Sequence, residues 1–299
     1  MMLFDVAIGL LILYFVWKII LLYLRTLEIK QVCDRYVFIT GCDTGFGYLL
    51  ARSLDAKGVN VIAGCLTEKG SRNLKKEASS RIKTVQLDVT DKKSVERAFE
   101  LTKQYVGDKG LWGLVNNAGI MLNFCPAEWT PLKDYETESK VNLFGTIDMS
   151  LTFLPLLRMS RGRRELLGSG VTTHTIEPGG FNTNIANESK FLKILKTAYV
   201  RSDTERQNFY GGKISSYIFF VIKWYGVFIN TKPQKVVDVM AHALLAKHSK
   251  NSYAVGLDAT LFFGFLSWFP EWLVDRLLGW PAPDGHLCSE LQNIANKKN

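Results

Sequence analysis

Short apolar runs alternate with amphipathic stretches from residue 35 onward. The runs at 36–40, 60–65, 84–87 and 111–115 have the length of buried parallel strands, and turn-forming or polar residues follow them. The stretches 46–57, 70–80 and 91–106 have the length and spacing of helices. This alternation predicts an α/β fold over residues 35–260, a doubly wound parallel sheet with right-handed crossovers.

The second half of the chain is more apolar. Residues 129–157 and 233–248 are predicted to be helical, the former with a break near Asn142, and 171–176 to form a further strand. The stretches 214–229 and 261–280 are rich in Phe, Trp, Leu and Ile. Two interpretations stay open for the C-terminal segment, residues 261–299. It is either a lid over a substrate pocket or a second membrane contact, since Trp and Phe favour the membrane interface.

The N-terminal run, residues 3–24, is almost entirely apolar, with Asp5 and Lys18 as exceptions. At 1.5 Å per residue a helix over this run spans about 33 Å, enough to cross a bilayer. A cleaved signal peptide fits less well, because no basic region precedes the run and no small-residue cleavage motif follows it. A buried soluble helix would carry more polar positions. We therefore expect an uncleaved membrane anchor over residues 1–25.

Charges around the anchor predict its orientation. Arg25, Lys30 and Arg35 follow the run and only Asp5 precedes it, so the positive-inside rule favours a cytosolic position for the rest of the chain. Asn187 opens an N-E-S glycosylation sequon, which is usable only in a lumen. Such sequons occur often by chance, so the charge-based prediction stands.

Composition narrows the function classes. The 299 residues, 47% of them hydrophobic, suffice for an anchor and one large domain with a real core, which excludes wholesale disorder. The net charge of +9 suits an anionic membrane surface; nucleic-acid binding is disfavoured because no basic and aromatic stripe accompanies it. Five widely spaced cysteines without a C-x-x-C pair argue against a disulfide scaffold or a zinc site.

Candidate cofactor-binding residues follow three of the predicted strands. The segment TGCDTGFG, residues 40–47, opens a helix; its glycines let backbone N–H groups approach a pyrophosphate, and the helix N-terminus favours negative charge. A carboxylate at the end of the third strand can meet an adenine amino group, and NNAG, residues 116–119, ends the fourth strand. Ligands bind at such carboxyl ends of adjacent parallel strands. The candidates are Thr40, Gly41, Asp43, Thr44, Gly45, Phe46, Gly47, Asp88, Val89, Asn116, Ala118 and Gly119.

These motifs, with IEPG at 176–179, resemble the short-chain dehydrogenase/reductase family over residues 35–260. The runs FITGCDTGFG, LTEKG, LDVTD, DKGLWGLVNNAG and IEPGGFNT are similar to its microsomal retinol and 17β/3α-hydroxysteroid dehydrogenase branch. The resemblance implies a Rossmann-type, NAD(P)-dependent oxidoreductase of lipophilic alcohols, retinoid or steroid, at the endoplasmic reticulum membrane. It adds Pro178, Gly179 and Thr183 to the cofactor-binding residues.

The choice of cofactor is predicted from residues near the glycine loop. Residues 65–67, where an acidic residue usually contacts the adenine ribose, are CLT, with Glu68 just beyond. The glycine loop holds no Lys or Arg for a 2′-phosphate, and Asp43 would repel one. Lys69 and Arg72 are the nearby cations. The pattern favours NAD over NADP.

Most of the catalytic unit that the resemblance implies is missing. The family uses a Tyr-x-x-x-Lys helix for proton transfer, a Ser on the preceding strand and an Asn on an earlier helix. Asn142 matches the Asn and is the catalytic residue we assign. At residues 161–166, RGRREL joins two ends that the family separates by a strand, a loop and that helix. We infer that roughly 25–30 residues, including one central strand and its following helix, are missing.

Two other places carry the Tyr-x-x-x-Lys spacing. Tyr14 and Lys18 lie in the anchor, and Tyr105 and Lys109 lie before the NNAG strand, so both pairs are interpreted as chance. Loss of a general acid/base typically costs about 10²–10⁴-fold in rate, so we expect little or no turnover. A nucleotide-binding pseudoenzyme or interaction partner at the membrane is the alternative, and an active enzyme with an unusual base is least favoured.

The missing unit also has structural consequences. Its strand belongs beside the NNAG strand, so the sheet is expected either to keep a gap or to take residues 171–176 into the vacant position. In either case apolar surface that the missing helix would cover is exposed. We therefore expect the chain to be marginally stable, or to depend on partners or on the membrane for its stability. Since the missing helix is half of the usual family dimer interface, a dimer is doubtful.

Overall fold

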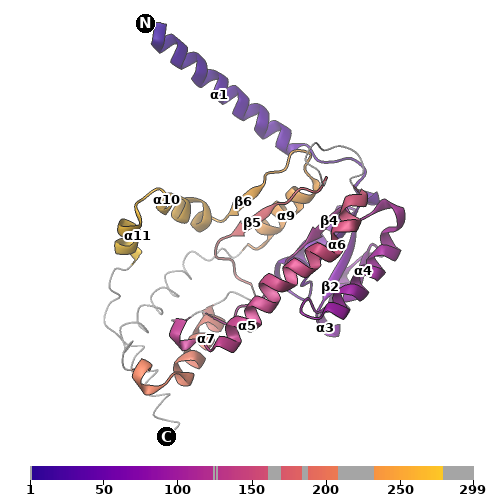
Figure 1. Cartoon of the computed structure of the whole chain (residues 1–299). Helices are drawn as coiled ribbons and strands as arrows, with labels where there is room; N and C mark the ends of the chain where they lie inside the picture. The colour runs from indigo at the N-terminus through magenta and orange to yellow at the C-terminus, as the bar shows by residue number, and fades with distance from the viewer. Residues whose placement is uncertain are drawn as a thin grey trace.

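The computed structural model describes residues 2–123, 125, 127–160, 170–183, 188–207 and 232–278. The apolar stretch 214–229, the RGRREL join, the sequon at Asn187 and residues 279–299 lie outside them. Helix α1 (Met2–Thr26) projects from the rest of the chain (Figure 1). From Phe4 to Thr26 its mean hydropathy is 2.3 and none of its most apolar window is buried, so by length and composition it can cross a membrane.

A four-stranded parallel sheet organises the domain, as the alternating pattern predicts. Its strands are β1 (Tyr36–Ile39), β2 (Asn60–Cys65), β3 (Ile82–Gln86) and β4 (Gly113–Val115), in the order β3-β2-β1-β4. In the parallel register Tyr36 lies opposite Asn60, and Val37 opposite Gly113. The carboxyl ends of all four strands therefore meet at one edge of the sheet, where we expect a ligand.

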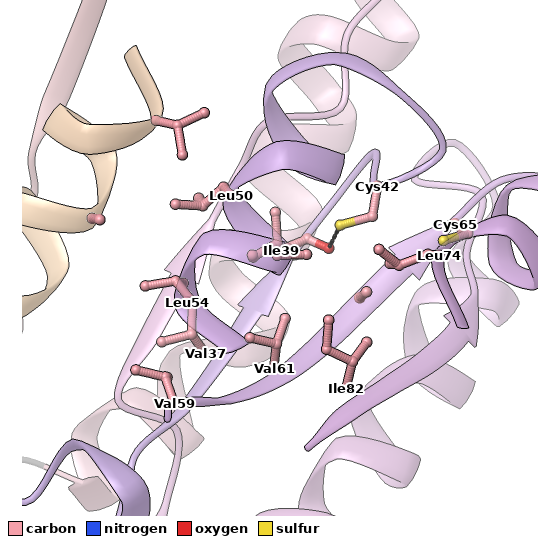
Figure 2. Close-up of a cluster of buried hydrophobic side chains, with 14 of the residues drawn as sticks. Val37, Ile39, Cys42, Leu50, Leu54, Val59, Val61, Cys65, Leu74 and Ile82 are labelled. Carbon is pink, nitrogen blue, oxygen red and sulfur yellow. Dashed lines mark hydrogen bonds between the residues drawn. The ribbon is translucent and has the colours of Figure 1, made fainter. Parts of the chain in front are cut away.

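Helices cover both faces of this sheet. Strand side chains alternate between the faces: Val37 and Ile39 join one buried cluster, and Phe38 between them joins another. Figure 2 shows the first cluster, in which Leu50 and Leu54 pack on the strands. The helices are α2 (Gly45–Ala56), α3 (Glu68–Glu77), α4 (Lys92–Val106), α5 (Leu132–Ser139), α6 (Thr146–Ser160), α7 (Glu188–Arg201), α9 (Gln234–Leu245), α10 (Gly264–Leu266) and α11 (Glu271–Leu278). Short 3₁₀ turns are η1 (Val32–Asp34), η2 (Gly107–Lys109) and η3 (Ala127–Trp129).

Three aromatic rings fill the centre of the second cluster. The ring centroid of Phe153, from α6, lies 4.8 Å from that of Phe38 and 5.7 Å from that of Phe99 on α4. Both contacts are tilted or edge-to-face, the arrangements that aromatic quadrupoles favour. This contact fixes α4 and α6 on the face of the sheet opposite α2 and α9.

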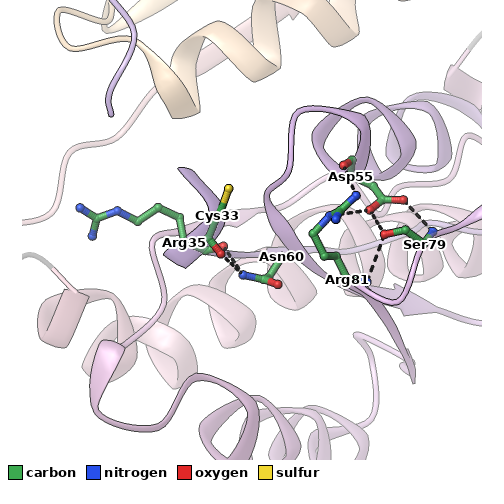
Figure 3. Close-up of polar contacts among 6 residues, drawn as sticks. All are labelled: Cys33, Arg35, Asp55, Asn60, Ser79 and Arg81. Atoms are coloured by element: carbon green, nitrogen blue, oxygen red, sulfur yellow. Dashed lines mark hydrogen bonds and ion pairs between the residues drawn. The ribbon is translucent and has the colours of Figure 1, made fainter. Parts of the chain in front are cut away.

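Asp55 joins the end of α2 to the turn before β3 (Figure 3). This buried carboxylate accepts a hydrogen bond from the backbone N–H of Ser79 at 2.8 Å and forms an ion pair with Arg81 Nε at 3.2 Å. Asn60 lies in the same view and donates to the Cys33 carbonyl at 2.6 Å, just before β1 begins. Such partners offset the cost of burying a charge, so these polar groups set the positions of β1, β2 and β3 without straining the core.

The predicted strand at 171–176 is wrong in position. Strand β5 (Thr175–Pro178) begins four residues later and pairs with β6 (Ser252–Val255) in a separate two-stranded parallel sheet. Residues 171–174 instead line a cavity of about 650 Å³, together with β4 and apolar side chains of α6 and α9. The strand pairs with β6, and among the described residues no strand pairs with the free side of β4, in line with one of the two expected outcomes.

Two irregular helical segments interrupt the second half. The π-helix η4 (Lys140–Gly145) separates α5 from α6, which confirms the predicted break near Asn142. The π-helix η5 (Asp258–Phe263) leads into α10, and Pro270 precedes α11, so the apolar stretch from residue 261 is broken as its proline predicts. π-turns are rare and are often found at functional sites.

Leu50→Ala tests the core cluster. Leu50 is fully buried between β1 and α9, so its truncation should leave a cavity and lower the free energy of unfolding by about 2–5 kcal/mol. Leu101→Ala on α4 is the matched control, since Leu101 is 38% exposed and its truncation should change stability by less than about 0.5 kcal/mol. Urea unfolding of the full chain in detergent measures both, and equal losses would contradict this packing.

Candidate cofactor site

Thr40, at the end of β1, ties the sheet's central strands together. Its hydroxyl oxygen accepts hydrogen bonds from the backbone N–H groups of Asn117 and Ala118, each at 2.9 Å. Its own N–H donates to the Val115 carbonyl at 3.0 Å. Thr40 is only 1% exposed, so these bonds are shielded from water. The glycine loop and the NNAG segment are thereby held side by side.

The glycine loop has no room for side chains at two positions. A Cβ on Gly41 would lie 2.8 Å from Ala118 Cα, and one on Gly47 would lie 2.5 Å from Asn117 Nδ2. Gly41 also has φ +70°, a conformation that other residues rarely adopt. Asn117 Nδ2 donates to the carbonyls of Thr40 at 2.9 Å and Gly41 at 3.2 Å. This close approach keeps the loop backbone open to a ligand, as the sequence predicts.

The N-terminus of α2 follows the loop directly. Thr44 is its N-cap residue, in an extended conformation, and its side chain makes no capping hydrogen bond. Gly45 and Phe46 begin the first turn, whose N–H groups have no intrahelical partner. Donors of this kind and the helix dipole suit a phosphate, so the loop and the helix fit the pyrophosphate of a dinucleotide.

Asp43 links the glycine loop to the turn after β2. Its Oδ2 accepts from the backbone N–H of Leu66 at 2.8 Å, and its Oδ1 accepts from the N–H of Thr67 at 2.9 Å and from the Thr67 hydroxyl at 2.6 Å. The Thr67 hydroxyl also caps α3. A carboxylate is therefore fixed beside the turn where a dinucleotide fold places its adenine ribose.

Asp88 and Val89 follow β3 at the same edge of the sheet. Asp88 Oδ1 accepts from the backbone N–H of Thr90 at 2.9 Å and from its hydroxyl at 2.7 Å. Its other oxygen, Oδ2, makes no hydrogen bond with the described residues, and Asp88 is half-buried. Val89 packs against Gly145 so closely that a Cβ there would lie 2.8 Å from its side chain. One carboxylate oxygen thus faces the edge where we expect the adenine.

Asn142 lies in the π-helix η4 and is held by both ends of its amide. Its Oδ1 accepts from the Ile120 N–H at 2.9 Å, and its Nδ2 donates to the Ile120 carbonyl at 2.8 Å. Nearby, Asn116 Nδ2 donates to Ser150 Oγ on α6 at 2.9 Å. The NNAG segment, including Gly119, is therefore fixed to η4 and α6. Asn142 is exposed.

The loop after β5 approaches the glycine loop from the other side. A cavity of about 440 Å³ is lined by Asp43, Thr44 and Gly45 together with Asn182 and Thr183. The ring centroids of Phe46 and Phe181 lie 6.0 Å apart, edge to face. Pro178 ends β5, and the Gly179 N–H donates to the Val255 carbonyl at 2.8 Å. The structure thus brings the sequence-predicted residues of both loops to one site.

Two residues that sequence reasoning missed help to hold this site. Asn117 is the first: it belongs to the NNAG motif, but only the fold reveals that its amide reaches the glycine loop. Asp258 is the second: it is 6% exposed and accepts a hydrogen bond from the N–H of Gly180. No local pattern marks Asp258, because it is 78 residues away from its partner.

Neither displaced Tyr-x-x-x-Lys pair lies at this edge. Lys18 Nζ lies 5.4 Å from the ring centroid of Tyr14, inside the apolar helix α1. Lys109 Nζ donates to Asp34 Oδ1 at 2.6 Å, just before β1 begins, at the amino edge of the sheet. The Asp34 carboxylate raises the pKa of the Lys109 ammonium, so this lysine is a charged partner far from the cofactor edge.

Comparisons with known proteins agree with this geometry. A family model described as short chain dehydrogenase matches residues 35–164. Retinol dehydrogenase 7 of Rattus norvegicus is 37% identical, with 88% of this chain and 94% of the relative covered. The chain belongs to the short-chain dehydrogenase/reductase family. Within it, 17-beta-hydroxysteroid dehydrogenase type 6 of Homo sapiens is 38% identical over 85% of this chain and 92% of the relative, which places the chain in the retinol and hydroxysteroid branch.

Solved short-chain dehydrogenase/reductase structures share the fold. A short-chain dehydrogenase from Streptomyces avermitilis superposes with a TM-score of 0.60 at 18% identity, covering 89% of this chain and 99% of that chain. A glucose/ribitol-type dehydrogenase from Brucella melitensis superposes with a TM-score of 0.54 at 19% identity, covering 74% and 94%. At these identities the similarity establishes the Rossmann-type fold.

The alignments also contain positions that this chain does not fill. The rat alignment runs over 297 residues, whereas 88% of 299 residues is about 263, so about 34 positions (297 minus 263) have no counterpart here. The human alignment runs over 290 residues against about 254, which leaves about 36. Both values lie above the roughly 25–30 residues inferred to be missing at the RGRREL join.

Two cysteines at the site should be unreactive in the folded chain. Burial raises the pKa of the Cys65 thiol to about 12 and that of Cys42 well above its usual value, with the carboxylate of Asp43 adding to both. At pH 8 a thiol with a pKa of about 12 has on the order of 10³-fold less thiolate than one of ordinary pKa. We expect a thiol reagent to modify the exposed Cys33 but leave Cys42 and Cys65 unmodified until urea is added. Peptide mapping measures this, and equal labelling of all three in the folded chain would contradict the burial.

Proposed function

We propose that this chain is a membrane-anchored protein of the retinoid or steroid oxidoreductase type that binds NAD. We propose further that it has little or no turnover. The observation that carries the proposal is a complete nucleotide cradle beside an unfilled position in the sheet. Thr40 and Asn117 hold the glycine loop against the NNAG segment, and a cavity of about 650 Å³ adjoins β4, the strand beside which we infer that an element is missing. In this proposal the chain keeps the residues that bind the nucleotide but lacks those that transfer the proton.

The loss of turnover follows from proton transfer. A bound nicotinamide supplies hydride transfer, and the protein must take up or give a proton at the alcohol oxygen. Asn142 remains, but its amide is engaged with Ile120, and an amide does not ionise near neutral pH. Neither Tyr-x-x-x-Lys pair of the chain reaches this edge. A lipophilic substrate is supported by the names of the relatives, retinol and hydroxysteroid dehydrogenases.

The preference for NAD rests on Asp43. Three hydrogen bonds fix its carboxylate beside the turn after β2, so a 2′-phosphate would meet a negative charge that cannot turn away. Glu68 adds a second carboxylate in the first turn of α3. Lys69 and Arg72 follow on the same helix, and the Arg72 guanidinium forms an ion pair with Glu68 at 3.4 Å.

The location that fits these features is the endoplasmic reticulum membrane, with α1 as a single anchor and the remaining chain on the cytosolic side. Support comes from the length and composition of α1 and from Arg25 and Lys30 after its apolar run. A dimer of the family type is not expected, since the helix that would form half of its interface belongs to the missing unit.

A pseudoenzyme that acts through nucleotide-dependent partner binding is the second candidate. The intact loop favours it, because Gly41 and Gly47 retain the close contacts of a working cradle. It differs from a merely damaged dehydrogenase in that NAD should stabilise the fold and be needed for a partner to bind.

NAD binding is tested with a matched pair of glycine variants in lipid nanodiscs. A ligand at 100 times its Kd should stabilise the wild-type chain by about 2.7 kcal/mol, seen as a rise in Tm. Gly47→Ala should abolish this rise, because its Cβ would overlap Asn117, while Gly264→Ala should keep it, because its nearest neighbour is 3.7 Å away. Loss of the rise in both variants, or in neither, would contradict the cradle.

Turnover is tested in the same preparations with all-trans-retinol or an androgen diol. The rate should fall about 10²–10⁴-fold below that of a relative that has the Tyr-x-x-x-Lys unit. Robust NAD-dependent turnover that is lost in Gly47→Ala would overturn the inactive assignment. If the wild-type chain shows neither turnover nor an NAD-dependent rise in Tm, nucleotide binding is overturned as well.

Asp43→Asn tests the cofactor preference. The amide keeps the size of the side chain but removes the charge, so the affinity for NADP relative to NAD should rise by about tenfold, equivalent to about 1.4 kcal/mol. Asp91→Asn is the control, since Asp91 caps α4 away from the glycine loop and Asn caps helices equally well. Titration of both cofactors by protein fluorescence measures the ratio, and an unchanged ratio in Asp43→Asn would show that another group selects the cofactor.

A further inference from the structure

Large apolar side chains of the C-terminal segment form one exposed series. Its members recur every three or four residues from Leu257 to Trp272, through η5 and α10 and, past the break at Pro270, into the start of α11. Each is between 65% and 88% exposed, with Trp268 the most exposed. Soluble proteins rarely leave such a contiguous apolar surface to water. We call it the apolar face: Leu257, Leu261, Phe265, Trp268 and Trp272.

The other side of the same segment packs on the domain. Asp258 is 6% exposed and accepts a hydrogen bond from Gly180, and Leu266 is 9% exposed. The segment is therefore anchored by one polar and one apolar contact, while its large apolar residues point outward. A lid over a substrate pocket would turn these residues toward the domain, so their direction favours a partner outside the protein.

The foot of α1, the residues from Arg25 to Ile29 at and just after its C-terminal end, is hydrogen-bonded to the end of α9, which β6 connects to the apolar face. The Ile29 N–H donates to the Leu245 carbonyl and the Lys247 N–H to the Leu27 carbonyl, each at 2.8 Å, around a bridge between Glu28 and Ala246. These bonds join the residues after α1 to the end of α9. The membrane helix is thus attached to the domain and does not hang on a free linker.

His242 strengthens this junction. Its Nε2 lies 2.8 Å from the Arg25 carbonyl at the end of α1, and its Nδ1 lies 2.9 Å from the Tyr253 hydroxyl on β6. Strand β6 runs from the foot of α1 to η5 and α10 (Figure 1). The position of the apolar face relative to the anchor is therefore set by α9 and β6.

Cations gather where a bilayer spanned by α1 would have its headgroups. Arg25 ends the helix, Lys30 follows it, and Lys247 and Lys250 lie in the turn between α9 and β6, with both lysines of that turn exposed. Anionic headgroups attract such cations. Trp and Phe side chains favour the interfacial belt of membrane proteins, and the apolar face supplies two Trp and one Phe.

We propose that the apolar face lies in the interface of the same bilayer that α1 spans, so that the domain contacts the membrane at two places. This inference rests on the anchor in the proposed function. The partner is a lipid surface: the face is aromatic and apolar, β6 connects it to the junction that holds the anchor, and that junction carries exposed basic residues. The contact holds the Rossmann-type domain against the membrane, where lipophilic molecules concentrate.

Spin labels on the full-length chain test the contact. Leu261→Cys and Phe265→Cys place labels on the apolar face, Ile12→Cys places one in the middle of α1, and Leu101→Cys places one on α4 as the water-exposed control. All are made in a background in which Cys33, Cys125 and Cys288 are replaced by Ser. The chain is reconstituted in vesicles of phosphatidylcholine and phosphatidylserine at about four to one, a composition that carries the negative surface charge of a cytosolic leaflet. Accessibility to oxygen, which partitions into lipid, is compared with accessibility to a nickel chelate in water.

The expected result is that labels at 261 and 265 resemble the label at 12, with oxygen collisions dominating, whereas the label at 101 is dominated by nickel. Labels at 261 and 265 that resemble 101 would overturn the inference while the anchor stands. Labels shielded from both reagents would also overturn it, since protein then covers the face. A label at 12 that resembles 101 would reject the anchor itself, so the two proposals fail in distinguishable ways.

Discussion

The hydroxyl of Thr40 is the contact on which the site depends. It lies at the end of β1, one of the two inner strands of the four-stranded order, and it accepts from the N–H groups of Asn117 and Ala118 in the segment after β4. Asn117 returns the contact by donating to the glycine loop. These reciprocal bonds are buried, where hydrogen bonds are strong and unpaired groups are costly. The glycine loop and the NNAG segment are therefore held together independently of the catalytic unit that we propose to be missing.

The sheet ends where the family's central strand would continue it. Val115 turns its carbonyl toward β1, so Leu114 presents its backbone polar groups to the other side, where the 650 Å³ cavity separates β4 from β5. Strand β5 pairs with β6 instead, and α9 bridges the two sheets by packing on α2 and on both of these strands. Cover by α9 explains how the domain tolerates the gap: the first core cluster closes without the missing strand.

Membrane attachment and the nucleotide site are connected through the same elements. Strand β6 starts at the foot of α1, pairs with β5, and ends beside Asp258, whose carboxylate holds Gly180 in the loop that lines the site. A change at the membrane-facing segment would thus reach the loop after β5 through one buried carboxylate. The arrangement places the site, the anchor and the apolar face on one continuous run of structure.

Periodicity and motif spacing in the sequence were sufficient to predict the long apolar N-terminal helix, the parallel strands, the break near Asn142 and the edge of the sheet at which the glycine loop and the NNAG segment lie, because each depends on residues that are close along the chain. The fate of residues 171–176 was not predictable, since their pairing with β6 is decided by which edge offers hydrogen bonds. The roles of Asn117 and Asp258 were hidden for the same reason: their partners are 76–77 and 78 residues away. Local chemistry determined the elements and the cradle, and tertiary packing alone decided that the gap stays open and that the apolar face points outward.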